Sequence, residues 1–289
     1  MMYEGAVFRP PSEARSLIIQ VTIGCAHNKC TFCGMYKAKK FRMRTLEEIF
    51  ADLDEMSYHY GKYPIRIFLA DGDALVLRNE LLVKILERIK LDFPKVERIT
   101  AYARASDVCR KSVAELIELK EHGLEMVYMG AESGNETILK NVCKGIGCKE
   151  LIEASDMLKQ SGIKLSVTFI SGLGGKEMLE EHALDSAKLT NRMNPEYVGF
   201  LTLMLEDDVP IMQDIRAGRL TLLKPAEVVE EMQIYLTNVD SEGSVFRSTH
   251  ASNYFMLKGT LNGDRDKMLA ILDEVNKRKA YRPDFIRGL

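Results

Sequence analysis

The sequence lacks a surplus of either charge, a long apolar run and a dense set of cysteines, and each absence excludes a class of protein. Its 40 Lys and Arg residues against 42 Asp and Glu residues give a formal net charge of -2, which provides no attraction for nucleic acid or an anionic membrane. No apolar stretch reaches the roughly 18 residues of a membrane helix, and the N-terminal segment has no basic region followed by an apolar one. We therefore expect a cytoplasmic protein with no nucleic-acid or membrane partner.

The cysteines do not form the pattern of a disulfide-stabilised secreted domain. There are six in 289 residues, and their uneven spacing favours reduced thiols or metal ligands. Three of them, Cys25, Cys30 and Cys33, lie within the short stretch TIGCAHNKCTFCGMYKAKKF at 22–41. The other three are scattered, and we interpret them as structural: Cys109, Cys143 and Cys148.

Strand and helix patterns alternate along most of the chain. Apolar runs predict six strands, at 16–23, 65–76, 98–106, 125–133, 164–175 and 197–205. Amphipathic segments predict helices between them, at 45–61, 79–93, 112–123, 148–162 and 179–193. Such alternation calls for parallel strands with right-handed crossovers. We predict an α/β fold, a partial (β/α)6 barrel of the TIM type.

The predicted barrel core comprises residues 1–206, and the rest of the chain is expected to extend it. Two short helices are predicted within 207–240, an extra strand or loop at 244–255, and a final helix at 264–279. No Gly/Ser-rich or Pro-rich linker separates these segments from the core. We therefore interpret 207–289 as a C-terminal extension that packs on the barrel mouth, not as an independent domain.

The cysteine loop follows the first predicted strand, and the active sites of barrels lie at the carboxyl ends of their strands. The Cys-x2-Cys turn brings two sulfurs to one metal centre, and Cys25 can fold back to a third corner. A 4Fe-4S cluster with three cysteine ligands keeps one iron open for a small molecule. A structural zinc site would need a fourth ligand such as His27, and a chance grouping of buried cysteines is the third alternative. We favour the cluster.

The segment CAHNKCTFC resembles the cluster loop of the radical S-adenosylmethionine superfamily. That family commonly has the spacing Cys-x3-Cys-x2-Cys with an aromatic residue before the last cysteine. Phe32 fits this pattern, but Cys25 and Cys30 are one residue further apart. The resemblance implies a 4Fe-4S cluster held by Cys25, Cys30 and Cys33, and S-adenosylmethionine bound to its open iron.

Two segments at predicted strand ends carry the resemblance further. LADGDAL (69–75) stands where the family has a Gly-rich motif whose backbone oxygens receive the cofactor's ammonium group. It contains a single glycine, Gly72, between Asp71 and Asp73, which would add negative charge. Arg104, at the end of the third predicted strand, could pair with the cofactor's carboxylate through a bidentate contact; a salt bridge in the barrel is the equally plain alternative.

Two later segments complete the cofactor site that the resemblance implies. GAESGNETILKNVCKG (130–145) resembles the Glu-Ser-Gly segment of the methylthiotransferase and coproporphyrinogen oxidase branches, in which a carboxylate contacts the cofactor, and Glu132 is the candidate. ISGLGGKE (170–177) matches a glycine turn in which small residues let adenine lie against the backbone. Gly172 and Gly174 are the candidates there.

The resemblance also implies a mechanism and partners. A reducing donor such as flavodoxin or ferredoxin would supply an electron, and cleavage of S-adenosylmethionine would give a 5'-deoxyadenosyl radical that abstracts hydrogen from a small-molecule substrate. The protein supplies orientation and excludes water. Polar residues of the late segments are the candidates for substrate contact: Glu206, Asp207, Asp208, Arg247, His250 and Asn253.

An acidic mouth at 206–208 would suit an ammonium group or a polyhydroxylated ligand. We expect a lyase that acts on a small polar molecule. The specific hypothesis is that it cleaves queuine, a 7-deazaguanine base with an amine and a diol, in queuosine salvage. One alternative is an oxidative decarboxylase that resembles oxygen-independent coproporphyrinogen oxidase. Another is a non-catalytic iron-sulfur or zinc protein. The chemistry of the family is too diverse for the fold to decide among these.

Overall fold

A computed structural model describes residues 3–206 and 208–287 of the chain. The chain divides into two compact units. The first unit contains Met1–Asn28, Met35–Met129 and Glu153–Leu165. The second contains Lys29–Gly34, Gly130–Ile152 and Ser166–Leu289. The cysteine loop therefore begins in the first unit, belongs to the second unit at Lys29–Gly34, and returns to the first unit at Met35.

The first unit is built on parallel strands in the order β1-β4-β5-β6. Their bounds are β1 Leu17–Gln20, β4 Ile65–Ala70, β5 Val96–Tyr102 and β6 Leu124–Glu132. A short antiparallel pair, β2 (Thr22–Ile23) and β3 (Arg42–Met43), flanks the cysteine loop. The helices of this part of the chain are α1 Leu46–Tyr60, α2 Asn79–Asp92, α3 Ala105–Val108, α4 Val113–Glu121 and α6 Cys148–Ser161, with a 3-10 turn at Pro11–Glu13.

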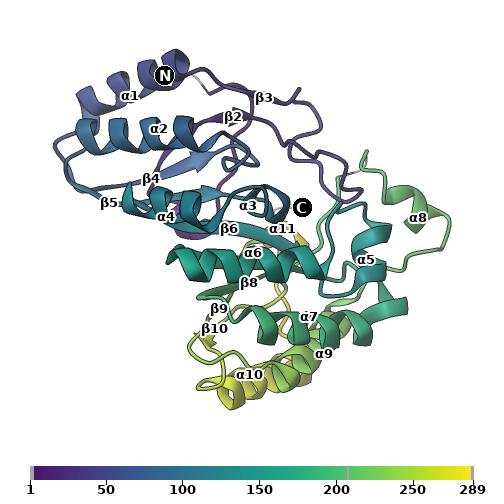
Figure 1. Ribbon diagram of the computed structural model, residues 1–289. Coiled ribbons are helices and arrows are strands. Elements are labelled where there is room, and N and C mark those ends of the chain that lie inside the picture. The colour runs from purple at the N-terminus through teal and green to yellow at the C-terminus, as the bar shows by residue number, and fades with distance from the viewer. Residues whose placement is uncertain (1–2, 207, 288–289) are drawn as a thin grey trace. The chain divides into compact units, whose positions relative to one another are not determined.

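Local sequence signals start two of these helices. The side chains of Thr45 and Ser112 accept the backbone N–H groups of Glu48 and Glu115, and each glutamate reaches back to the N–H of its cap residue. These reciprocal capping boxes satisfy backbone donors that a helix start would otherwise leave unpaired. Helices α1 and α2 lie side by side and contact each other (Figure 1). Their buried residues, among them Leu53 and Ile85, join the core.

The second unit continues the alternation. Strand β7 (Lys164–Ser171) pairs in parallel with β8 (Tyr197–Thr202), and β8 pairs in parallel with β9 (Val245–Ser248). The last strand, β10 (Leu257–Thr260), is antiparallel to β9. The helices are α5 Glu136–Asn141, α7 Leu179–Met193, α8 Met212–Arg216, α9 Pro225–Asn238, α10 Arg265–Arg278 and α11 Asp284–Arg287, with a 3-10 turn at Lys176–Met178.

The prediction of an α/β fold with mostly parallel strands is confirmed. The predicted strands and helices all occur, and the strands end earlier than predicted because their carboxyl ends pass into loops, as at Ala70 and Ser171. Helix α9 and strand β9 add a further helix and parallel strand within the predicted extension, and α9 packs between α7 and α10 (Figure 1). The boundary at 206/207 stays a prediction, because Asp207 lies outside the described residues.

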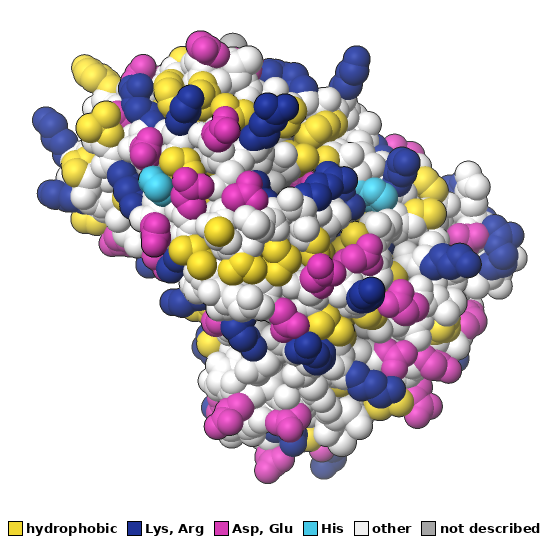
Figure 2. Space-filling view, viewed as in Figure 1, with side chains coloured by type: hydrophobic (Ala, Val, Ile, Leu, Met, Phe, Trp, Pro, Cys, Tyr) yellow, Lys and Arg dark blue, Asp and Glu magenta, His cyan; other side chains and the backbone are white. Residues whose placement is uncertain are grey.

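None of the helices within 3–206 and 208–287 combines the length and the apolar composition that are needed to span a membrane. On the face drawn in Figure 2, Lys and Arg side chains are interspersed with Asp and Glu side chains. That mixture agrees with the net charge of -2 for the chain. The face therefore carries no field of a single sign.

Candidate functional site

Asp71, which directly follows β4, anchors the start of the cysteine loop. Its Oδ2 atom accepts hydrogen bonds from the Gly24 N–H at 3.0 Å and from Gln20 Nε2 at 3.2 Å. Lys39 Nζ lies 2.6 Å from the same oxygen; the Asp71 side chain is buried and that of Lys39 is largely buried. Because Lys39 balances its charge, Asp71 has a structural role at the base of the loop; its predicted role toward the cofactor stays a prediction.

Gly72 brings the loop after β4 into direct contact with Cys25. The Gly72 N–H donates to the Gly24 carbonyl at 3.1 Å. A Cβ atom at position 72 would lie 3.0 Å from the Cys25 Cβ atom and 3.0 Å from the Tyr36 ring. These distances are shorter than ordinary packing contacts, so a side chain at position 72 would displace Cys25.

Asp73 and Arg104 belong to a buried charged cluster. Within the described residues neither carboxylate oxygen of Asp73 accepts a hydrogen bond, and burial, together with the nearby Asp107 carboxylate, raises the pKa of Asp73 well above its usual value. Arg104 Nη1 lies 3.8 Å from Asp107 Oδ2, and Arg110 also contacts Asp107, at 2.8 Å. The structure thus contains the salt bridge that was one alternative for Arg104; its contact with the cofactor's carboxylate stays a prediction.

The second half of the cysteine loop is held by two backbone hydrogen bonds. The Thr31 N–H donates to the Val142 carbonyl at 3.0 Å, and the Ile211 N–H donates to the Thr31 carbonyl at 3.0 Å. Phe32 packs against an apolar cluster that includes Ile138 and Val142. The loop segment between Cys30 and Cys33 is therefore fixed by the end of α5 and by the chain before α8.

None of the six cysteines forms a disulfide, and none is fully buried. Cys25 belongs to the first unit, and Cys30 and Cys33 belong to the second. Among the residues that the structure describes, no three His, Cys, Asp or Glu side chains lie together in a metal-ligating group. The assignment of the three thiols as cluster ligands thus stays a prediction.

Glu206, one of the predicted acidic residues after β8, contacts the cysteine loop. A Cβ atom on Gly34 would collide with the carboxylate of Glu206, so this exposed glutamate lies against the residue that follows Cys33. Asp208 is also exposed. Asp207 lies outside the described residues.

Glu132, at the end of β6, has a positive φ of 68°. Its carboxylate lies 2.7 Å from Lys144 Nζ, and both side chains are largely buried. The left-handed backbone is uncommon for a residue with a side chain and marks a strand end held in place by its surroundings. The ion pair gives Glu132 a protein partner, and its contact with the cofactor stays a prediction.

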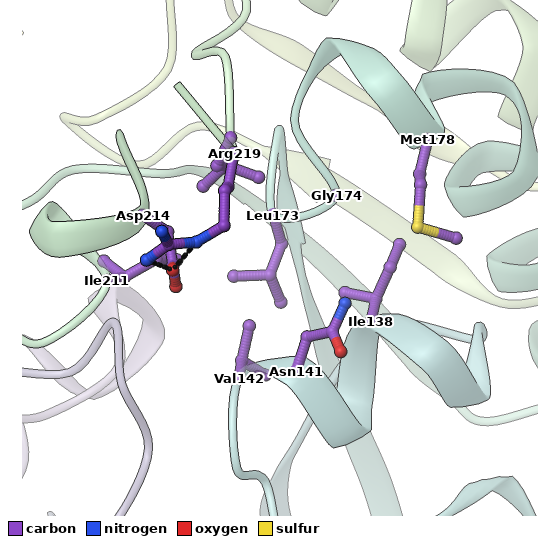
Figure 3. A pocket seen from close by; sticks show the side chains of 10 residues that line it. Ile138, Asn141, Val142, Leu173, Gly174, Met178, Ile211, Asp214 and Arg219 are labelled. Carbon is purple, nitrogen blue, oxygen red and sulfur yellow. Dashed lines mark hydrogen bonds and ion pairs between the residues drawn. The ribbon is translucent and has the colours of Figure 1, made fainter. Parts of the chain in front are cut away.

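The glycine turn after β7 borders a cavity of about 400 Å³ (Figure 3). Gly172 has a φ of 82°, which favours glycine, and a Cβ atom on Gly174 would lie 2.6 Å from the Ile138 side chain. Asp214 and Arg219 pair at 2.6 Å at one side of the cavity. The other lining residues are mainly apolar: Ile138, Asn141, Val142, Leu173, Met178, Ile211 and Leu220.

Two buried ionisable residues that sequence analysis missed contact these turns. His182 of α7 bonds to Ser133 Oγ and to the Ile170 carbonyl, and Glu231 of α9 accepts the Gly172 N–H. Each occupies a position on the buried stripe of its helix. A charged or titratable residue on an apolar helical stripe is the signal that could have identified both.

The polar candidates near β9 bond within the protein. Asn253 is buried, donates from Nδ2 to the Phe200 carbonyl at 2.8 Å and accepts from Thr202 Oγ1 at 3.0 Å. His250 Nδ1 lies 2.9 Å from Ser252 Oγ, and burial lowers its pKa. Arg247 is exposed and donates to two backbone carbonyls. These contacts give the three residues structural roles, and their contact with substrate stays a prediction.

Comparison with known proteins yields one family and several relatives. Residues 19–187 match the model of the radical SAM superfamily. An uncharacterised methyltransferase of Pyrococcus horikoshii is 28% identical over 185 residues, covering 63% of this chain and 38% of the relative. The chain spans 28% to 38% of the length of the three curated relatives that it matches.

Solved structures show the same fold at low sequence identity. Methylornithine synthase is 16% identical with a TM-score of 0.52, covering 95% of this chain and 85% of its own. Coproporphyrinogen III oxidase from Escherichia coli is 15% identical with a TM-score of 0.57, covering 77% and 52%. These likenesses confirm the predicted α/β fold of the partial (β/α)6 type. Because the family match covers more than half of the chain, the protein belongs to the radical SAM superfamily, whose members bind a 4Fe-4S cluster and S-adenosylmethionine.

Proposed function

We propose that this protein is an enzyme in which Cys25, Cys30 and Cys33 hold three irons of a 4Fe-4S cluster and the fourth iron binds S-adenosylmethionine. The observation that carries the proposal is the anchored cysteine loop. Asp71 binds the loop at Gly24, and backbone bonds to Thr31 hold its second half. Because each half of the loop is braced within its own unit, less backbone has to be ordered when the metal binds, which lowers the cost of binding.

The residues of the chain fit such a cluster. None of the three cysteines forms a disulfide, and thiolates are the ligands that iron-sulfur clusters use. The hydrogen of Gly72 is all that fits beside Cys25 without displacement, so the loop after β4 closes tightly on this ligand. The bound cluster, once reduced by a donor such as flavodoxin or ferredoxin, would supply the electron that cleaves S-adenosylmethionine.

The cavity beside the glycine turn is a candidate site for the adenine end of the cofactor. Its size of about 400 Å³ and the apolar side chains in its lining suit a planar ring, and its polar groups suit the ring nitrogens. Gly174 leaves space at the edge of the cavity, because a Cβ atom at this position would collide with the Ile138 side chain. The Asn141 amide in the lining offers both a donor and an acceptor for ring nitrogens. Arg104 and Glu132 are the proposed partners of the more polar end of the cofactor.

The substrate is proposed to be a small polar molecule, and queuine remains the specific hypothesis. The position of Glu206 against Gly34, next to Cys33, favours a ligand with an amine near the cluster. A second candidate reaction is methyl transfer, which the name of the Pyrococcus horikoshii relative suggests. The two reactions leave different products, so one assay distinguishes them.

The test is anaerobic reconstitution with iron and sulfide, followed by dithionite, S-adenosylmethionine and queuine, with mass spectrometry of the products. Cleavage of queuine predicts 5'-deoxyadenosine together with a truncated deazapurine. Methyl transfer predicts S-adenosylhomocysteine and a methylated product. If 5'-deoxyadenosine forms at the same rate with and without queuine, the assignment as a radical enzyme stands and queuine is rejected as its substrate.

Cysteine variants test the cluster assignment. Replacement of Cys25, Cys30 or Cys33 by Ala is expected to abolish both bound iron and cofactor cleavage. Cys109→Ala is the matched control, and it should retain both. Normal cleavage by Cys30→Ala would refute the proposal, and a colourless protein with full zinc occupancy would replace it by a structural zinc site.

A further inference from the structure

We propose that His182 and Glu231 are positioning residues that hold the Glu-Ser-Gly segment after β6 and the glycine turn after β7 in one arrangement that binds S-adenosylmethionine. The inference rests on the proposed function, because these two segments are the proposed cofactor-binding loops. Neither residue lines the cavity. Both therefore act through the loop groups that they bind.

His182 connects the two loops through its two ring nitrogens. Its Nδ1 atom lies 2.8 Å from Ser133 Oγ, and its Nε2 atom lies 3.0 Å from the Ile170 carbonyl oxygen. A carbonyl only accepts, so Nε2 carries the proton, and Nδ1 of a neutral ring then accepts the Ser133 hydroxyl. Burial lowers the pKa of His182 to about 4, which keeps the ring neutral and this donor pattern in place at neutral pH.

Glu231 binds the glycine turn at Gly172, two residues after the Ile170 carbonyl that His182 binds. Both of its carboxyl oxygens lie 3.1 Å from the Gly172 nitrogen, which donates to them. Glu231 Oε1 also lies 3.9 Å from His182 Nε2. Ile170 and Gly172 thus each have a backbone group bound by one of the two buried side chains. The turn between β7 and the cavity is clamped on both sides of Ser171.

Helix α7 binds the other loop through additional side chains. Ser186 Oγ accepts the Gly134 N–H at 3.0 Å, and Asp185 Oδ2 accepts from Asn135 Nδ2 at 2.8 Å. Ser133 Oγ, bound to His182, also accepts the Asn135 N–H at 3.0 Å. Because α7 packs against α9, the two helices form one platform that binds both loops.

Fold stability alone does not account for this arrangement. His182 and Glu231 are only 1% and 2% exposed, and burying ionisable groups costs free energy that apolar residues of similar size would not. The hydrogen bonds that these two side chains make go to Ser133, Ile170 and Gly172, all of which lie in or beside the two loops. A hydrogen-bond network that lowers fold stability but fixes the conformation of two loops is expected of a preorganised binding site.

The test uses three substitutions on α9 and one, Ser133→Ala, in the loop after β6. Glu231→Leu removes the acceptor of the Gly172 N–H, whereas Glu231→Gln retains an acceptor oxygen. Glu230→Leu, on the exposed side of α9, is the matched control. Hydrogen–deuterium exchange of residues 170–177 is measured in the protein without cofactor, and the dissociation constant of S-adenosylmethionine is measured on the protein with an oxidised cluster, so that no turnover is involved.

Glu231→Leu should speed exchange in 170–177 and weaken S-adenosylmethionine binding by roughly tenfold, the order expected for a lost buried hydrogen bond, with unchanged iron content. Glu231→Gln should restore both quantities, and Glu230→Leu should leave both as in the original protein. Ser133→Ala, a small change that the fold should accommodate, is expected to weaken binding in the same direction and to speed exchange in 131–136.

Two outcomes separate this inference from the proposed function. Unchanged exchange in Glu231→Leu, or faster exchange with undiminished affinity in both Glu231→Leu and Ser133→Ala, overturns the positioning role while cofactor cleavage by the original protein stands. An original protein with a complete cluster that binds no S-adenosylmethionine overturns the proposed function, and with it the purpose assigned to the two residues.

Discussion

Raising the pH from 6.5 to 8 should destabilise the fold through Glu231. Burial raises the pKa of Glu231 from 4.5 to about 8. Between these values the folded protein holds a proton that the unfolded chain has released, so its contribution to stability is complete below about pH 4.5 and is lost as the pH rises through 8. His182 has its ordinary pKa at 6.5 and a folded value of about 4, so the unfolded chain loses only about half a proton from it above pH 6.5, an opposing change of about 0.4 kcal/mol.

The size of the effect follows from the width of that window. Each pH unit in which one state binds one more proton changes the free energy of unfolding by about 1.4 kcal/mol. From pH 6.5 to 8, Glu231 should therefore remove about 2 kcal/mol of stability. Urea unfolding at both pH values measures this difference, provided that the protein lacks cluster and cofactor throughout.

Glu231→Gln is the variant that isolates the effect. Glutamine does not titrate and keeps an acceptor for the Gly172 N–H, so its stability should change by about 2 kcal/mol less than that of the original protein over the same pH interval. Glu230→Gln, with an exposed side chain, should keep the original pH dependence. Equal pH dependence in Glu231→Gln and the original protein would refute the reasoning.

Three further predictions concern the cysteine loop. Gly72→Ala should destabilise the protein by about 1–3 kcal/mol, the usual cost of overpacking, and lower the iron content after reconstitution, because its methyl group would press on Cys25; Gly263→Ala, where the nearest atom is 4.0 Å away, should change neither quantity. Asp71→Asn should cost about 2–4 kcal/mol in urea unfolding, because it leaves the largely buried ammonium group of Lys39 without a charge partner, and an unchanged midpoint would contradict the role of this carboxylate as an anchor. Phe32→Ala should cost about 1–3 kcal/mol, less than the loss of a fully buried ring, because Phe32 is only partly buried against the apolar cluster; the comparison of iron content with that of Phe32→Leu then tells whether the aromatic ring itself matters.

Much of the fold could be predicted because its signals are local. The capping box at Thr45 and the glycine after α4 set helix ends that the sequence analysis located closely. The short helices α3 and α5 and the strand β10 were missed, because four to six residues carry too little periodicity to recognise. Strand ends were overextended for a related reason: apolar residues such as Leu75 continue into the loop after β4, where they are buried without pairing as a strand.

The candidate site could be predicted only in part. The cysteine loop and the glycine turn stood out through residue types that local chemistry requires. The partners that hold them did not: Asp71 lies 47 positions from Gly24, and Glu231 lies 59 positions from Gly172. No local pattern records such a pairing. The sequence predicts a cofactor role for Asp71, which stays a prediction, but it does not indicate the contacts of this carboxylate with Lys39 and the Gly24 N–H.

By itself, the sequence determined the family, the α/β alternation and the three-cysteine loop, because each of these is written in residue types at short spacing. Only the tertiary structure decided that Gly72 touches Cys25, that Lys39 balances Asp71, and that a neutral histidine and a buried glutamate clamp the turn after β7. These contacts join residues far apart in the chain. They arise when the strands align and burial removes water, so that each buried polar group must find its partner within the fold.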